Sequence, residues 1–155
     1  FPEGVIFEDV PIMYKIILQC NRIACCKHDV YMQRRRSGST TRMEFSEKRK
    51  KYVEFSYQVY RDICKYYPQL EKEAYVYYLI SVVDNYINLS CSSNRKKYKF
   101  YRRNLNSIIR KNESFMQEYS FLSKQKSRIV ICRMGMGRIC NDLYRRIRNQ
   151  NEEKK

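Results

Sequence analysis

Two groups of polar residues near the start of the chain could do chemistry together. The first is the acidic pair Glu8–Asp9, which stands directly before an apolar run. A carboxylate at a helix N-terminus is kept ionised by the helix dipole, so it can serve as a general base. The second is a basic loop that contains Arg34, Arg36 and Ser39. Guanidinium groups bind phosphate oxygens in pairs and hydroxyls add donors, so this loop suits a phosphorylated ligand.

Each group also has a plainer explanation. Asp is a preferred N-cap, so Asp9 could simply cap the helix that follows it, with Glu8 as a solvated neighbour. For an isolated acidic pair this explanation is the more common one. The basic loop could equally be an exposed charged connection, as in many proteins. Position in the sequence alone does not decide between these alternatives.

The elements around these groups are short. Pro11 and the apolar spacing of Ile12 and Ile16 predict a helix from Asp9 or Val10 to about Cys20. Residues 23–26 and 30–33 are compatible with two short strands joined by a tight turn. Residues 41–44 have the form of a capping box, T-x-x-E, which predicts that another helix follows.

The chain after residue 44 has a helical pattern throughout. Apolar and aromatic residues recur at helical spacing over residues 52–66, before Pro68. Residues 70–89 are predicted to form a second helix. Its segment 74–83 is apolar on almost every side, so we expect this to be the central buried helix. Further helices are predicted near residues 98–108, 114–122 and 127–149. The tyrosines of these stripes are typical of a core and of helix interfaces, rather than of platforms that stack bases.

The sequence therefore predicts a mainly α protein. Residues 1–43 would form a short α/β segment of one helix and two short strands. Residues 44–155 would form a bundle of about four to five helices. With only four Gly and three Pro in 155 residues, turns are few, which favours long helices over a β-sandwich.

The composition limits the classes of binding partner and favours one cellular compartment. The formal net charge of +16 indicates an anionic partner: nucleic acid, an anionic membrane surface or a phosphorylated ligand. Seven Cys without zinc-site spacing and a single His argue against a metal or redox centre, and reduced packing cysteines are typical of the cytoplasm. No signal peptide and no apolar run of about 20 residues are present.

The last predicted helix, residues 127–149, is amphipathic and basic. It is either a bundle helix with solvated charges or a helix that lies on an anionic membrane, with Arg138, Arg145 and Arg148 among the headgroups. The sequence favours neither alternative.

Taken together, the two polar groups resemble a known family. The pattern F-x-E-G-x-x-F-E-D-V, followed after about twenty residues by V-Y-x-x-R-x-R-x-G-S-x-T, is similar to the acceptor-side part of bacterial family 2 glycosyltransferases. Here it reads FPEGVIFEDV and VYMQRRRSGSTT. The resemblance covers residues 1–41, whereas the helical tails of that family vary.

The resemblance implies a GT-A fold and transfer of a sugar from a nucleotide-sugar, with inversion, to a glycan or lipid-linked acceptor in surface polysaccharide synthesis. Asp9 would be the catalytic base and Glu8 would help to position the acceptor. Arg34, Arg36 and Ser39 would lie near the donor diphosphate. The parent enzyme would use Mg or Mn, held by a D-x-D motif. It would act in the cytoplasm, with peripheral attachment to the inner face of the cell membrane as a further possibility.

The sequence also departs from the family pattern. It holds no D-x-D motif and no nucleotide-binding half, and it begins with Phe1 inside the first motif. We therefore expect a C-terminal fragment that binds no cofactor and is inactive by itself. The alternative from another class is a basic helical module that binds nucleic acid or another protein; it explains the charge but not the pattern of residues 1–41.

Overall fold

The computed structural model describes residues 6–25, 27–28 and 44–139. Every regular element in these ranges is helical. Five helices have eight residues or more: α1 (Val10–Gln19), α2 (Glu47–Tyr66), α3 (Glu71–Cys91), α4 (Lys99–Lys111) and α7 (Lys126–Arg133). The shorter elements are the 3₁₀ helix η2 (Pro68–Leu70), α5 (Glu113–Gln117) and α6 (Ser120–Lys124).

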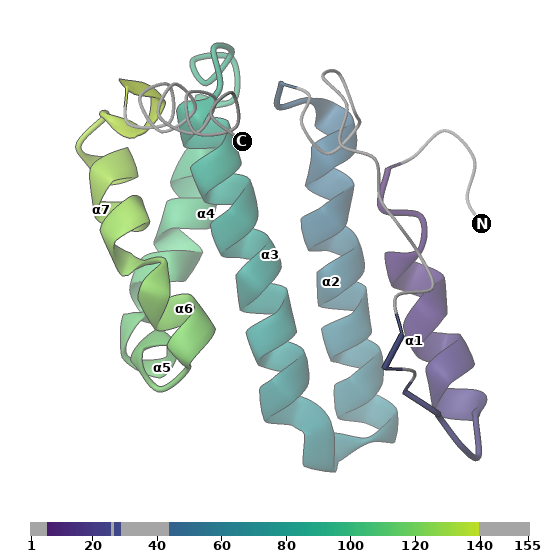
Figure 1. Cartoon of the computed structure of the whole chain (residues 1–155). Coiled ribbons are helices and arrows are strands. Elements are labelled where there is room, and N and C mark those ends of the chain that lie inside the picture. The colour runs from purple at the N-terminus through teal and green to yellow at the C-terminus, as the bar shows by residue number, and fades with distance from the viewer. Residues whose placement is uncertain (1–5, 26, 29–43, 140–155) are drawn as a thin grey trace.

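Helices α2 and α3 form an antiparallel pair at the centre of the molecule, joined through η2 (Figure 1). Helix α1 lies along α2, on the side away from α3, and α4 to α7 gather on the other side of α3. The helix ends on either side of η2 follow from Pro68, which restricts the residue before it to extended backbone. The sequence predicted this boundary, and it is confirmed.

Helix α3 is the central buried helix, as its composition predicted. Leu79, Val82 and Leu89 are completely buried. Leu79 and Val82 belong to a core that α3 shares with side chains of α4, α5, α6 and α7, including Leu105, Ile109, Met116, Leu122, Ile129 and Cys132. Leu89 packs in a second cluster with Phe45 and Tyr98. Two polar side chains within α3 bond to the preceding turn: Asn85 Nδ2 donates to the Ser81 carbonyl at 3.1 Å, and the Ser81 hydroxyl donates to the Tyr78 carbonyl at 2.7 Å. These bonds satisfy part of the polar groups of a helix that is surrounded on nearly every side.

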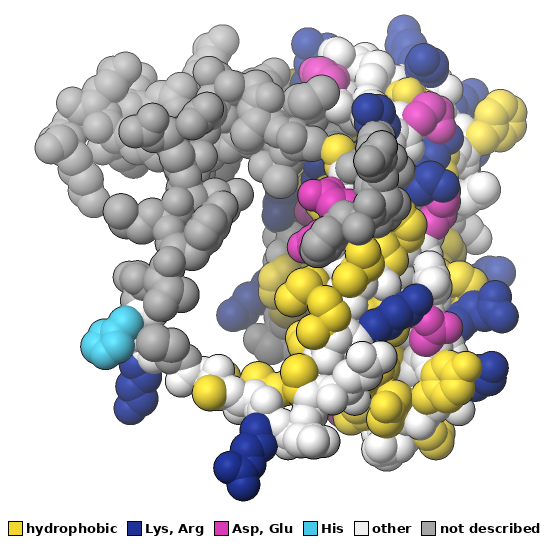
Figure 2. All heavy atoms as spheres, turned by 90° about the vertical axis from the view of Figure 1, so that its right-hand side faces the viewer, with side chains coloured by type: hydrophobic (Ala, Val, Ile, Leu, Met, Phe, Trp, Pro, Cys, Tyr) yellow, Lys and Arg dark blue, Asp and Glu magenta, His cyan; other side chains and the backbone are white. Residues whose placement is uncertain are grey.

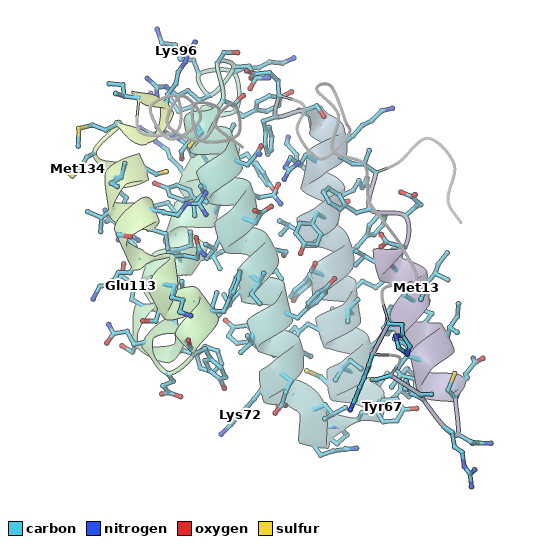
Figure 3. All side chains as sticks on the ribbon, in the orientation of Figure 1. Met13, Tyr67, Lys72, Lys96, Glu113 and Met134 are labelled. Atoms are coloured by element: carbon cyan, nitrogen blue, oxygen red, sulfur yellow. The ribbon has the colours of Figure 1, made fainter. Side chains whose placement is uncertain are left out.

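Helix α1 is held against α2 by its inner face. Val10, Tyr14 and Leu18 pack on a small core formed by Val59, Ile63 and Ala74. The Tyr14 hydroxyl donates a hydrogen bond to Asp62 of α2. On the outer face Met13, Ile16 and Ile17 are between 44% and 49% exposed. Figure 2 shows hydrophobic side chains gathered on this face of the molecule, and Figure 3 labels Met13 on α1. The predicted first helix is confirmed, and it carries apolar surface on two sides.

Three predictions about local structure were wrong. The described part of the chain contains no strand; residues 23–25 are irregular because no neighbouring strand pairs with them there, while residues 30–33 lie outside the described ranges. The helix predicted at 114–122 is two short helices, α5 and α6. The helix predicted at 127–149 ends at Arg133, because Gly135 adopts a left-handed conformation with φ +80°. The division of the chain at residue 43 remains a prediction.

The end of α7 is a Schellman motif. The Gly135 N–H donates to the Cys132 carbonyl at 3.2 Å, and the Met136 N–H donates to the Ile131 carbonyl at 3.1 Å. Residues 137–139 are helical again after this turn. The periodic pattern continued across the break, which is why periodicity alone predicted one helix.

Glu44 does not take part in a capping box at the start of α2. That helix begins at Glu47, after Ser46. The Glu44 carboxylate instead accepts hydrogen bonds from the Ser92 hydroxyl, the Ser93 hydroxyl at 3.0 Å and the Ser93 N–H at 3.1 Å. Glu44 therefore ties the segment before α2 to the end of α3.

These bonds make the stability of the protein depend on pH. The hydrogen bond from Ser92, followed by those from Ser93, lowers the pKa of Glu44 below its ordinary value of 4.5. A lowered pKa means that the stabilisation is complete above about pH 4.5 and is lost as the pH falls through the folded-state pKa. We expect Glu44→Gln to reduce the free energy of unfolding at pH 7 by about 1 kcal/mol or less, because the carboxylate is exposed. Urea unfolding of both proteins should show the difference vanishing at low pH; a difference that persists there would contradict this role.

Candidate functional site

A cleft of about 520 Å³ lies across α3. One wall comes from the turn before α1 and from α2, the floor from α3, and the opposite wall from α6 and α7. Its lining residues are Phe7, Asp9, Val10, Arg49, Tyr52, Tyr77, Ile80, Val83, Asp84, Ile87, Phe121, Gln125 and Arg128. The floor is mainly apolar, with Tyr77 and Asp84 as its polar side chains, and the other polar groups stand on the walls. A mainly apolar lining with a few polar groups is usual for small-molecule sites.

The turn that carries the acidic pair is anchored by Phe7. The Phe7 ring stacks on the Tyr52 ring with centroids 4.6 Å apart, and the Arg49 guanidinium carbon lies 5.6 Å from its centroid. Phe7 has φ +64°, a left-handed conformation that a bulky residue rarely adopts. The ring contacts with α2 offset this backbone strain, and such strain is often found at functional turns. Phe7 thereby fixes where Glu8 and Asp9 stand relative to the cleft.

Asp9 precedes α1, but its side chain does not cap that helix. The Asp9 carbonyl accepts the N–H groups of Ile12 and Met13, at 3.1 and 2.9 Å, while its carboxylate makes no cap hydrogen bond. The carboxylate lines the cleft instead. Its charge contributes to the raised pKa values of Tyr52 and Tyr77 on the facing helices. The plainer explanation of Asp9 as a side-chain N-cap is therefore not what the geometry shows.

The deepest charged group of the cleft wall is Arg49. Arg49 is only 7% exposed, and its Nη2 atom lies 3.2 Å from Asp84 Oδ2. Burial, followed by the neighbouring Tyr77 and the charge of Asp84, raises the pKa of Tyr52 to about 12, although Arg49 opposes this. Burial is also the main cause of the raised pKa of Tyr77. Both phenols are therefore protonated at neutral pH and can donate hydrogen bonds into the cleft.

Arg49 should hold the anchored turn in place. Replacing it in Arg49→Met keeps most of the buried stem but removes the ion pair with Asp84 and the contact with the Phe7 ring. Asp84 is half exposed and can be solvated, so we expect a loss of about 1–2 kcal/mol in the free energy of unfolding, measured in urea. The matched variant Arg128→Met, on the opposite wall, should change it by about 0.5 kcal/mol or less. Equal effects of the two changes would contradict the special role of Arg49.

The structure places some of the predicted site residues and leaves others outside its described ranges. Asp9 lines the cleft, and Glu8 is exposed beside it. The predicted diphosphate-binding residues, Arg34, Arg36 and Ser39, lie outside the described residues. Their proximity to Asp9 therefore stays a prediction.

The predicted membrane-facing residues are also only partly placed. Arg138 is exposed just after the turn that ends α7, and its charge contributes to the lowered pKa of Glu44. Arg145 and Arg148 lie outside the described ranges. Membrane contact through these three residues remains a prediction. Within the described residues, no helix is both long enough and apolar enough to cross a bilayer.

Sequence reasoning missed four polar residues of the cleft: Arg49, Tyr52, Tyr77 and Asp84. Tyr52 was assigned to the apolar stripe of α2, and the other three were not singled out. A signal was present, because Arg49 continues that stripe one turn earlier and Asp84 interrupts the apolar run of α3. The pairing of these two charges depends on the packing of α2 against α3, which the sequence does not reveal.

The described residues do not fit a divalent cation site. No group of three or more His, Cys, Asp or Glu side chains in these ranges could hold a metal ion. The Mg or Mn that the resemblance implies would therefore need ligands from elsewhere. The cleft itself offers two carboxylates, two phenols and two guanidinium groups, which suit a polyhydroxyl ligand.

Comparison of the chain with protein-family models, with curated proteins and with solved structures finds no match.

Proposed function

We propose that this chain forms the acceptor side of an inverting family 2 glycosyltransferase. The enzyme would move a sugar from a nucleotide-sugar to a glycan or lipid-linked acceptor during surface polysaccharide synthesis. One observation carries the proposal: the Asp9 carboxylate stands at the start of α1, makes no cap hydrogen bond and lines the cleft. The motif around it, FPEGVIFEDV, supports the same conclusion.

The chemistry assigns one task to each group. Asp9 accepts the proton of the acceptor hydroxyl while the hydroxyl oxygen bonds to the anomeric carbon of the donor sugar. The bond from that carbon to the diphosphate breaks, and the nucleoside diphosphate leaves. Tyr52 and Tyr77 donate hydrogen bonds to acceptor hydroxyls, and exposed Glu8 helps to position the acceptor. Phe7 fixes the position of Asp9 relative to these acceptor-binding groups, and efficient proton transfer requires such a fixed position.

The nucleotide-sugar must reach Asp9 from a part of the protein that binds the donor. Helix α1 begins at Asp9, and its outer face carries the exposed apolar residues Met13, Ile16 and Ile17. We expect a donor-binding unit to pack on this face, because burying it would also bring the donor next to the base. Arg34, Arg36 and Ser39 would then contact the donor diphosphate. Arg138, Arg145 and Arg148 would hold the enzyme at an anionic membrane surface in the cytoplasm.

The first test is to incubate the 155-residue chain with common nucleotide-sugars and Mg²⁺ or Mn²⁺. We expect no release of nucleoside diphosphate above background, because the sequence holds no D-x-D motif. Sustained release would overturn the assignment of this chain to the acceptor side alone.

The second test addresses the alternative function. Any protein with a net charge as positive as +16 is expected to bind RNA or DNA weakly, in a way that depends on salt. Titration of the chain with RNA and DNA of defined sequences should therefore show no preference for one sequence. Tight, sequence-specific binding that persists at physiological salt would favour the nucleic-acid module instead.

A further inference from the structure

Two thiols meet at one end of the bundle. Cys91 is the last residue of α3 and Cys132 lies near the end of α7. Their side chains are hydrogen-bonded to each other, and the Cys91 thiol also donates to the Gly137 carbonyl, with Sγ and O 3.2 Å apart. This end of the molecule can be found in Figure 3 from two labelled residues: Met134, just after α7, and Lys96, in the loop between α3 and α4.

Gly137 provides the room for this pair. A Cβ atom at Gly137 would lie 2.9 Å from Cys132 Sγ and 3.4 Å from Cys91 Sγ. Both sulfurs therefore sit against the same point of the backbone. The Schellman turn at Gly135 returns the chain to that point, so the close approach is part of the fold rather than a chance encounter of surface side chains.

We propose that Cys91 and Cys132 are a reversible disulfide site that links α3 to α7. The oxidant is a low-molecular-weight disulfide such as oxidised glutathione. The Cys91 thiolate attacks it, forming a mixed disulfide and releasing one glutathione thiolate. Cys132 then attacks the Cys91 sulfur and its proton passes to the second departing thiolate. Two protein thiols are thus oxidised to one disulfide, and one molecule of oxidised glutathione is reduced to two of glutathione.

The order of attack follows from exposure. Cys91 is partly exposed, whereas Cys132 is 3% exposed. The hydrogen bond that the Cys132 thiol donates to Cys91, followed by burial, raises the pKa of the Cys132 thiol, so it is a poor first nucleophile. It is well placed as the second one, because it already touches the sulfur that it must attack.

The other described cysteines have different surroundings. Cys20 is exposed and donates to the Ile16 carbonyl at 3.3 Å, and Cys25 is also exposed. Cys64 is hydrogen-bonded to the Tyr60 hydroxyl. Among the cysteines in the described ranges, Cys91 and Cys132 are the two that are hydrogen-bonded to each other.

The bond would act on the cleft. Cys132 follows Arg128 of one cleft wall by one turn of α7, and Cys91 follows Ile87 of the floor by one turn of α3. A covalent link at this end fixes the two helices relative to each other, and it closes a long loop that restricts the unfolded chain. The inference needs only the geometry of the two thiols and does not rest on the proposed function.

The experiment uses the whole chain. After exposure to oxidised glutathione and alkylation of the remaining thiols, tryptic peptides are analysed by mass spectrometry without reduction. We expect peptides with Cys91 and Cys132 joined, lighter by two hydrogens than the sum of the two, and separated by a thiol reductant. The oxidised chain should also melt at a higher temperature than the reduced chain.

Cys91→Ser and Cys132→Ser should each lose both the linked peptide and the rise in melting temperature. The matched variant Cys64→Ser should keep them. The wild-type peptide map decides the matter even where a variant fails to fold. Glutathione bound at Cys91 with no link to Cys132, or a link from either residue to another cysteine, would overturn the proposal.

Discussion

In the active enzyme that contains this chain, Asp9→Asn should lower the rate of sugar transfer by about 10²- to 10⁴-fold, the usual contribution of a general base. Asn keeps the size of the side chain but cannot accept the proton of the acceptor hydroxyl. Binding of the nucleotide-sugar should change little, because the diphosphate is expected to contact the loop with Arg34, Arg36 and Ser39. Steady-state rates of nucleoside diphosphate release and a separate donor-binding titration measure the two effects.

Two matched carboxylate variants control for a general loss of charge. Glu8→Gln should weaken acceptor binding, raising its KM more than it lowers kcat, because Glu8 positions the acceptor without taking its proton. Glu118→Gln, exposed in the turn after α5, should change neither parameter. Turnover of Asp9→Asn close to that of the wild type would remove Asp9 as the base.

Leu79→Ala should reduce the free energy of unfolding by about 2–5 kcal/mol. Leu79 is 0% exposed at the centre of α3, within the core shared by α3, α4, α5, α6 and α7. Truncation removes buried contacts and leaves a cavity that the surrounding helices cannot close without losing their own packing. Urea unfolding followed by circular dichroism measures the loss.

The matched change Leu70→Ala tests whether burial is the cause. Leu70 ends η2 and is 41% exposed, so its loss should cost about 0.5 kcal/mol or less. A similar cost at both positions would mean that α3 is not the helix on which the fold depends.

The sequence predicted the elements whose ends carry local signals. Pro11 and Asp9 mark the start of α1, Pro68 separates α2 from α3, and the nearly continuous apolar run of α3 could only be buried. These features act within a few residues, so a pattern is enough to find them. The helical fold class after residue 44 follows from the same signals.

The wrong predictions concern features that the local sequence pattern does not show. Residues 23–25 have a composition that allows a strand, but a strand also needs a partner, and none is present in the described ranges. The amphipathic pattern after Lys126 continues past Gly135, yet the backbone turns there into a Schellman motif. Glu44 has the position of a capping residue but bonds to Ser92 and Ser93, which lie far along the chain. Contacts distant in sequence decided the first and third cases, whereas the local turn at Gly135 decided the second.

The candidate site also combines residues that a local signal reveals with residues that it does not. Asp9 stood out because its type and its position before a helix suggest a base; the structure places Asp9 in the lining of the cleft, and its role as a base remains a prediction. The ion pair of Arg49 with Asp84 and the stacking of Phe7 on Tyr52 join separate elements, so no local pattern reveals them. The stripe positions of Arg49 and Tyr52 show only that both lie on the packed side of α2.

The central claim is that Asp9 assists a single displacement at the anomeric carbon of a nucleotide-sugar. The most direct measurement is the configuration of the first-formed product of the enzyme that contains this chain, followed by NMR of its anomeric proton. A base that deprotonates the acceptor for attack opposite the diphosphate predicts an inverted product, absent in Asp9→Asn. A product with retained configuration, or no transfer from any of the common UDP-, GDP- and dTDP-sugars, would contradict the account.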